Sequence, residues 1–248
     1  MSITPRIASP SPKPLVCETS HIRFGESKAT FMNLVPLLIV IAFSSDPVPA
    51  AHHNDWLIVP GKRLGPITPD STRADLDRFF GKENVRDQPV DSGQGDEPAT
   101  QVYPTTPETT LSIFWKSTKI RDIVVCYPES TNHCKWHTKE GITLGSTFEK
   151  LEALNGRPFQ LLQWGSDGGG SITSWRGGHL APQFGGGANS KLWLTLDYPQ
   201  SPDGPTPEQH KWVDKVSGAG VFISSRNEAV RHLHPTVCRL VVVFSAIR

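Results

Sequence analysis

Two cysteines and two histidines lie close together near the middle of the chain. Cys126 and Cys134 flank the segment YPESTNH, and His133 and His137 lie beside the second cysteine. The cysteines can form a disulfide in an oxidising compartment, or all four side chains can offer thiolate and imidazole ligands to zinc. The alternatives exclude each other because a disulfide consumes both thiolates. The spacing matches no standard zinc finger, so we expect the disulfide and no cofactor.

A second candidate metal site depends on removal of a leader after Ala50. Cleavage there would expose Ala51 followed by His52 and His53. A free amine with histidine at the third position can hold Cu²⁺ or Ni²⁺ in a square plane. The alternative is a solvated chain end without a ligand.

Two pairs of titratable side chains, one of a carboxylate and a histidine and one of two carboxylates, are weak candidates for acid–base catalysis. Asp167 lies in a glycine-rich turn and His179 follows two glycines, while Asp122 and Glu140 form a second pair. Nothing in the sequence fixes the separation within either pair. Asp167 also suits a turn, and the second pair also suits a solvated surface. We therefore favour a protein without catalytic activity and keep a secreted hydrolase that acts on glycan or cell-wall material as the alternative.

Four of the seven tryptophans fall on segments that are typical of strands. They are Trp115, Trp164, Trp175 and Trp193. Exposed indoles would form a stacking face for a glycan or anchors for a protein partner, whereas buried ones would belong to the core. In the segment LWLTLDY, Trp193 alternates with the leucines, so it is the indole that we most expect at the surface. The candidate binding residues are Trp193, Trp164 and Trp175.

The stretch from 141 to 180 shows how such side chains are positioned. Ser146 and Glu149 have the spacing of a capping box, which predicts a helix start. Apolar residues then recur at three-residue spacing, and Asn155-Gly156 predicts the helix end. The segments 159–164 and 171–175 have the composition of strands and are joined by a glycine-rich turn.

The opening of this stretch repeats an earlier one, 75 positions upstream. Residues 67–81 align with residues 142–156 without a gap, from Ile67 with Ile142 to Gly81 with Gly156. The identical positions include the helix start, a core leucine and the glycine at the helix end. This pattern predicts an internal duplication, although two unrelated helices that obey the same capping rules would look similar.

The other segments complete an α+β pattern. We expect two tandem units, each a short helix followed by an antiparallel sheet of about three strands. The units would span residues 51–140 and 141–248, with an insertion at 199–220 that contains a helix capped by Thr206. Residues 85–100 are expected to form a polar loop. Further strands are predicted at 56–59, 101–103, 111–115, 120–127, 192–198, 221–224 and 236–246.

Residues 1–50 read as a leader. The apolar run Phe31–Phe43 is short for a membrane span and suits a signal peptide, and Val48-Pro49-Ala50 suits a cleavage site. Translation could begin at Met1 or Met32. The sequence therefore predicts a secreted or periplasmic protein with no stable membrane anchor after cleavage. The net charge of +1 gives no electrostatic case for nucleic acid.

Two resemblances follow from these residues. The Gly145-Ser146-Thr147 signal that opens a short helix ending at Gly156 resembles the tandem units of secreted β-lactamase inhibitor proteins and small outer-membrane assembly lipoproteins. The run from 141 to 178, with its paired glycines and Ser174-Trp175, resembles a set of uncharacterised secreted bacterial proteins. The first resemblance implies a protein-binding role, and the second carries over no site residues. We therefore expect a non-catalytic binding protein whose partner is another protein or a glycan.

Overall fold

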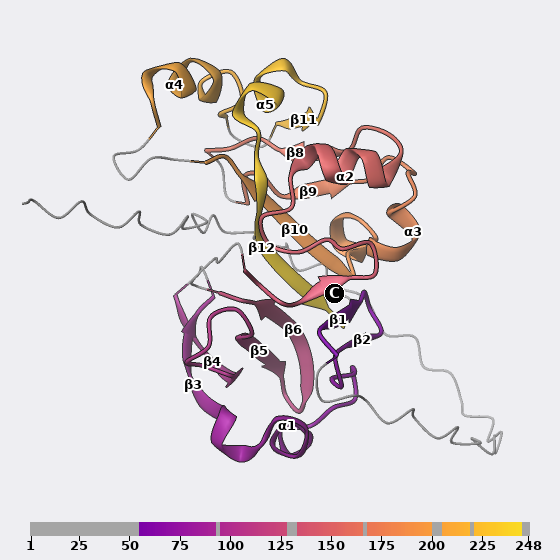
Figure 1. Ribbon diagram of the computed structural model, residues 1–248, viewed down its shortest axis with the longest axis vertical. Helices are drawn as coiled ribbons and strands as arrows, with labels where there is room; N and C mark the ends of the chain where they lie inside the picture. Colours follow the sequence, from indigo (N-terminus) through magenta and orange to yellow (C-terminus); the bar gives the residue numbers. More distant parts are fainter. Residues whose placement is uncertain are drawn as a thin grey trace, which may run out of the picture.

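The computed structural model describes residues 55–92, 95–127, 133–165, 168–199, 205–218 and 221–244. The fold is α+β, as predicted (Figure 1). The α-helices are α1 (Arg73–Phe80), α2 (Phe148–Asn155), α3 (Ala181–Phe184), α4 (Pro207–Val213) and α5 (Glu228–Leu233). The strands are β1 (Leu57–Val59), β2 (Arg63–Leu64), β3 (Val85–Asp91), β4 (Asp96–Val102), β5 (Leu111–Lys116), β6 (Lys119–Val125), β7 (His137–Thr138), β8 (Gln160–Leu162), β9 (Ile172–Ser174), β10 (Leu192–Asp197), β11 (Phe222–Ser224) and β12 (Thr236–Val243).

A six-stranded antiparallel sheet forms the centre of the molecule. Its strand order is β10-β12-β6-β5-β4-β3. The last strand, β12, lies between β10 and β6, and Val242 pairs with Ile123 across the junction. Strands from both halves of the chain therefore share one sheet. This corrects the expectation of a separate sheet of about three strands in each half.

Two smaller sheets complete the strand pairing of the described residues. One has the order β2-β1-β7 and the other β11-β8-β9. A single bridge between Ser171 and Thr195 connects the β9 end of the second sheet to β10 of the central sheet. The strands after α2 are thus spatial neighbours in the order β8, β9, β10 and β12. Strand β11 lies at the outer edge of β8.

The segment expected to be a polar loop is instead the β3–β4 hairpin. Its side chains are mostly polar, and Pro89 faces Pro98 across the hairpin. Proline and charged residues are typical of an edge strand, where one row of backbone groups needs no partner. These features concealed the strands, because they remove the alternation of apolar and polar residues that predicts a strand.

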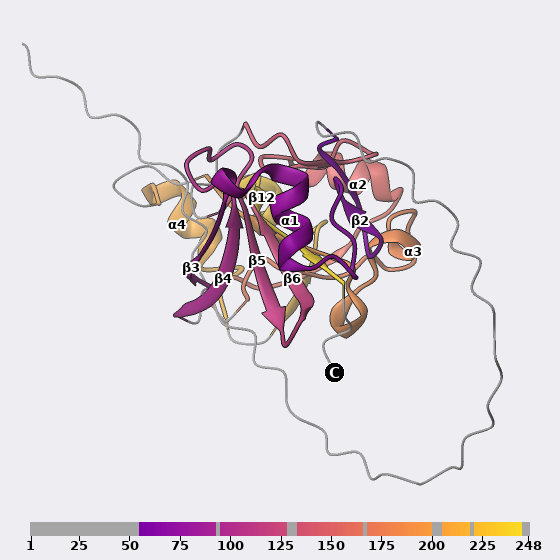
Figure 2. The ribbon, with the colours of Figure 1, turned by 90° about the horizontal axis from the view of Figure 1, so that it is seen from below.

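The main core lies between one face of the sheets and the helices. Leu76 and Phe80 anchor α1 there, and Phe148 and Leu151 anchor α2. Figure 2 shows α1 against one side of the strands β4–β6. In β10, Leu192, Leu194 and Leu196 all face this core, as their alternation predicted.

A second, smaller core forms on the opposite face of the central sheet, where the sheet curls. Arg239 on β12 donates from Nη2 to the carbonyl oxygen of Ser92, 3.0 Å away at the end of β3, four strands along the sheet. The apolar members of this core are Val90, Ala99, Phe114, Val124 and Tyr127. The β3–β4 hairpin therefore bends back over the sheet and buries its inner face.

The beginnings of α1 and α2 have matching hydrogen bonds. Ser71 Oγ accepts from Thr68 N at 2.9 Å, and Ser146 Oγ accepts from Thr143 N at 3.0 Å. The N-caps are the following threonines, and both helices have eight residues and end at a glycine. The predicted capping box of Ser146 and Glu149 is therefore not formed, because Ser146 closes the preceding turn and Thr147 caps the helix one residue later by accepting from Lys150 N.

Candidate functional site

The cysteine pair forms the predicted disulfide. Cys126 and Cys134 are bonded, and both are buried. The bond closes the loop between β6 and β7 and removes both thiolates from metal binding. Within the described ranges, no group of three or more His, Cys, Asp or Glu side chains could hold a metal ion. His52 and His53 lie outside the described residues.

The tryptophans divide between core and surface. Trp164 and Trp175 are 7% and 3% exposed and pack against the aromatic rings of Tyr198 and Phe159. They cannot form part of an exposed stacking face, which corrects that expectation for both residues. Trp193 lies on the face of β10 opposite the leucines and is partly exposed, as its position predicted.

The weak catalytic pairs do not assemble in the described residues. Asp167 lies outside them, and the exposed His179 places its ring against Gly156, where an added Cβ would lie 3.1 Å from the imidazole. Asp122 belongs to the curled face of the sheet, and the charged groups that act on it are Arg121, Glu97 and Arg239. Glu140 lies in the turn after β7, beside Lys139.

The charged groups on the curled face form a structural network. Arg121 binds both oxygens of Glu97, at 2.6 and 3.2 Å, and donates to Asp122 at 2.6 Å. Burial raises the pKa of Asp122 even though Arg121 opposes the shift, and burial lowers the pKa of Arg239. Burial also opposes ionisation of Arg121, but its bonds to the two carboxylates raise its pKa. Because these groups tie β4, β6 and β12 together, they hold the curl.

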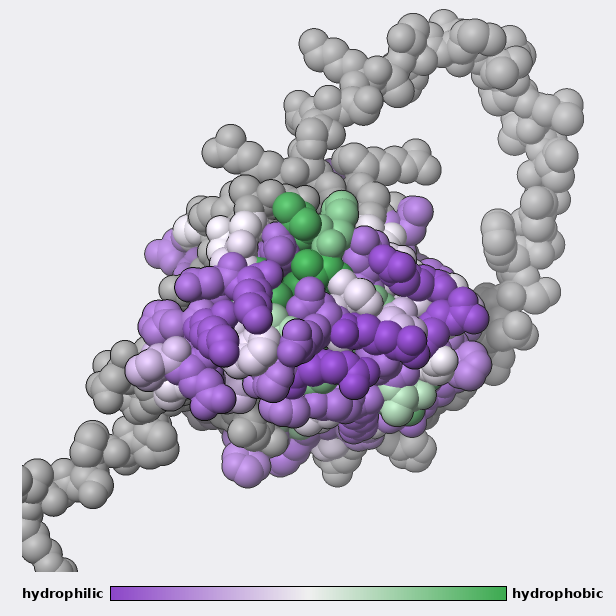
Figure 3. Space-filling model, turned by 90° about the horizontal axis from the view of Figure 1, so that it is seen from above, coloured by the Kyte–Doolittle hydropathy of each residue, from purple (hydrophilic) through white to green (hydrophobic). Residues whose placement is uncertain are grey.

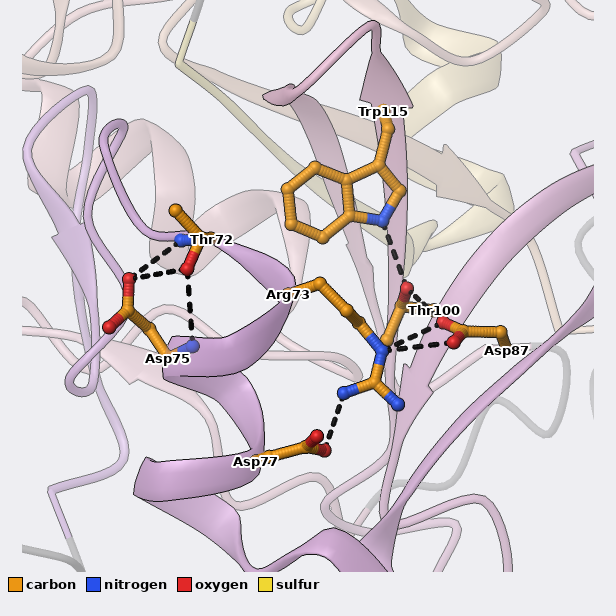
Figure 4. Close-up of polar contacts among 7 residues, drawn as sticks. All are labelled: Thr72, Arg73, Asp75, Asp77, Asp87, Thr100 and Trp115. Atoms are coloured by element: carbon orange, nitrogen blue, oxygen red, sulfur yellow. Dashed lines mark hydrogen bonds and ion pairs between the residues drawn. The ribbon is translucent and has the colours of Figure 1, made fainter.

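A second polar network fixes α1 to the central sheet (Figure 4). Arg73 donates from Nε to both oxygens of Asp87 on β3, at 2.9 and 3.0 Å, and also pairs with Asp77. Thr100 donates to Asp87 at 2.6 Å and accepts from the indole of Trp115 at 3.0 Å. The outer flank of α1 is therefore occupied by contacts within the protein.

The corresponding flank of α2 is open and forms a groove. Its volume is about 390 Å³. One stripe of the helix lines one side, and the opposite side comes from the turn after β11 and from α5. The lining residues are Phe148, Glu149, Glu152, Ala153, Gly156, Arg157, Arg226 and Arg231.

Glu152 organises the inner wall of this groove. Ser225 donates to its Oε2 at 2.7 Å, and its Oε1 lies 3.7 Å from Arg226 Nε and 3.6 Å from Arg231 Nη2. Glu149 is paired at 2.8 Å with His234. Both carboxylates of the groove are therefore engaged by neighbouring side chains.

The segment that supplies the arginines also carries exposed apolar side chains. Val221 is 51% exposed and Phe222 is 56% exposed, at the start of β11. Among the described strands β11 pairs only with β8, so it lies at the edge of its sheet. Figure 3, which looks down on this end of the molecule, shows a small apolar area among hydrophilic side chains.

Helices α4 and α5 lie next to β11 at this end of the molecule (Figure 1). The helices contact through Trp212 and His232, whose rings stack at 3.9 Å with an interplanar angle of 11°. Thr206 caps α4 and Gln209 completes a capping box, as the sequence predicted. The insertion and the segment after it thus form a side structure on the sheet, to which α2 contributes the facing wall of the groove.

Sequence reasoning missed the groove. Glu152 lies far along the chain from Arg226 and Arg231, and each looks like an ordinary surface charge in its own segment. The prediction of a strand at 221–224 did not indicate that Val221 and Phe222 would be exposed. Only the tertiary arrangement brings these residues together.

Comparisons with protein-family models, curated proteins and solved structures found no match to this chain. In the part of the chain that the structure describes, no helix is both long and apolar enough to cross a bilayer.

Proposed function

We propose that this chain is a non-catalytic binding protein that acts outside the cytoplasm. The observation that carries the proposal is the edge strand β11, where Val221 and Phe222 expose 51% and 56% of their surface. Apolar side chains on an open strand edge attract an extended segment of another protein, which gains main-chain hydrogen bonds and side-chain contacts together. The expected partner is therefore a protein that adds a strand beside β11.

A protein partner is supported over a glycan by the position of the aromatic rings. Trp164 and Trp175 are in the core, so they offer no platform on which a sugar could stack. Binding is supported over hydrolysis because the groove carboxylates, Glu149 and Glu152, are paired with His234 and with two arginines. These pairs hold the carboxylates to neighbouring side chains rather than to a reacting group.

Photo-crosslinking in the natural host tests the proposal. A photoreactive phenylalanine analogue at Phe222 is expected to form a covalent adduct with a discrete partner, and the Val221→Asp substitution is expected to abolish that adduct. The same analogue at the exposed Lys62, in the other half of the chain, is the control. Absence of an adduct from position 222, or the same adducts from both positions, would refute binding at β11.

We also infer that the two halves arose by duplication. The inference is supported by the recurrence of the turn, threonine cap, eight-residue helix and terminal glycine 75 positions apart, from Ile67 to Ile142. It is supported further by the strand sequence, since β3–β6 follow α1 and β8–β10 and β12 follow α2 in neighbouring positions. On this interpretation α4, β11 and α5 are additions to the second unit.

Export is part of the same proposal. The apolar run Phe31–Phe43 and the cleavage signal at Val48-Pro49-Ala50 support it from the sequence. The disulfide between Cys126 and Cys134 supports it independently, because such bonds persist in oxidising compartments. Mass spectrometry of the protein from its host should find a chain that begins at Ala51, and a chain with the full leader would contradict export.

A further inference from the structure

We propose that the groove along α2 binds carboxylate groups of an acidic peptide segment. This inference deepens the proposed function, on which it rests, by naming the chemistry of the partner. It concerns a surface separate from the apolar edge of β11, so each surface can be tested by itself.

The charges of the groove favour an anionic ligand. Arg157, Arg226 and Arg231 line it together with Glu149 and Glu152, which leaves one excess positive charge. Glu149 is already paired with His234, and this neutralises it further when the histidine is protonated. The groove therefore attracts a negatively charged group, although the whole chain is close to neutral.

The guanidinium groups retain donor capacity. Arg226 and Arg231 approach Glu152 only to 3.7 and 3.6 Å, which is longer than a hydrogen bond. Arg157 donates from Nη1 to a backbone carbonyl at 3.1 Å. A guanidinium group presents five N–H donors, so all three side chains can bind a further acceptor at the groove surface.

Glu152 shows that a carboxylate fits between these arginines. Its Oε2 is held by Ser225, whose own Oγ accepts from Phe159 N and is fully buried, so the carboxylate has a fixed position. An incoming carboxylate would meet the same two guanidinium groups from the open side. Paired planar N–H donors match the two oxygens of a carboxylate, which is why arginine recurs at such sites.

The shape of the groove favours a peptide over a small ion. The lining residues run along α2 from Phe148 and past the end of the helix to Arg157. Eight helical residues extend about 12 Å, and an extended peptide advances about 3.3 Å per residue. The groove is therefore long enough for about three or four residues, with Arg226 and Arg231 beside Glu152 and Arg157 just past the end of the helix.

Fluorescence anisotropy with a labelled hexaglutamate peptide tests this site on the mature chain. We expect hexaglutamate to bind at low ionic strength and hexaglutamine not to bind. The double substitution Arg226→Gln and Arg231→Gln is expected to weaken binding at least about tenfold, since each charge-assisted hydrogen bond is strong. The single substitution Arg157→Gln provides a second variant that leaves the contacts of Glu152 intact.

The control variant carries Lys62→Gln and Lys116→Gln, which remove the same charge from exposed positions in the first half of the chain. An equal loss of affinity in the control and groove variants would overturn the site. If inorganic phosphate displaces hexaglutamate when the two are present at the same concentration, the assignment to an acidic peptide is overturned. If hexaglutamate fails to bind while the crosslink from position 222 persists, this inference fails and the proposed function stands.

Discussion

Asn155 is a buried amide that connects α2 to the segment after β9. Its Nδ2 donates to the carbonyl oxygens of Arg157 and Trp175, at 2.9 and 3.0 Å, and its Oδ1 accepts from Leu180 N at 3.3 Å. Gly178 lies so close that an added Cβ would fall 2.1 Å from Oδ1. Sequence reasoning assigned Asn155 only to the helix end, because two of its partners, Trp175 and Leu180, lie 20 and 25 residues further along the chain.

Replacement of Asn155 by Ala should lower the free energy of unfolding by about 2–3 kcal/mol, because buried partners lose their hydrogen bonds. Denaturant titration measures the change. The matched control is Asn189→Ala, at an exposed position, which should change the free energy of unfolding by less than about 0.5 kcal/mol. Equal effects of the two substitutions would show that the Asn155 contacts contribute little.

Glu152 competes with an incoming carboxylate for the same guanidinium groups. The Glu152→Gln substitution keeps an acceptor for Ser225 but removes the negative charge. Hexaglutamate should therefore bind about threefold to tenfold more tightly, since about 1 kcal/mol of competing attraction is lost. Anisotropy titration provides the measurement. Weaker binding would indicate that Glu152 positions the arginines more than it competes with the ligand.

At the scale of the element, α1 depends on ionised carboxylates. Backbone and side-chain hydrogen bonds from Thr72 lower the pKa of Asp75 in the capping box. Burial alone would raise the pKa of Asp87, but hydrogen bonds from Thr100 and Arg73 lower it overall. A lowered folded-state pKa gives stability that is complete above the unfolded value of about 3.9 and is lost as the pH falls through the folded value.

We therefore expect the melting temperature to fall as the pH is lowered from about 5 to below 3. The Asp87→Asn substitution should reduce this pH dependence, because the amide does not titrate. The substitution Asp214→Asn removes one carboxylate from an exposed position in the second half and serves as the control. If both variants keep the full pH dependence of the parent chain, the contacts of Asp87 do not link α1 stability to pH.

The sequence predicted those elements whose local pattern is strong. The strands β5, β6, β10 and β12 are rich in β-branched or alternating apolar residues, and α4 has a complete capping box. The sequence did not predict the β3–β4 hairpin. Its prolines and charged residues suit an edge strand, but they remove the alternation of apolar and polar residues by which a strand is predicted. The disulfide was predictable from cysteine spacing, whereas the groove was not, because long-range packing alone assembles it.

At the scale of the whole molecule, β12 joins the two halves. Because the last strand lies between β10 and β6, neither half has a complete central sheet without it. The sequence predicted the correct fold class. It also predicted a separate sheet for each half, which is wrong, because the order of the strands depends on contacts between distant segments. The two halves should therefore unfold together.

Guanidinium unfolding should show a single transition, with tryptophan fluorescence and far-ultraviolet circular dichroism giving the same midpoint. A chain that ends at residue 140 should fail to form β6 stably, because that strand then lacks β12. Two separated transitions, or a folded fragment of residues 55–140, would show that the halves are independent units.

The central claim is that a partner protein binds at the β11 end of the molecule. Hydrogen–deuterium exchange, measured on the chain alone and in complex with the partner captured from position 222, tests it most directly. Backbone amides in residues 221–234 and 148–157 are expected to exchange more slowly in the complex. Protection confined to the β3–β6 strands, with no change at β11 or α2, would contradict it.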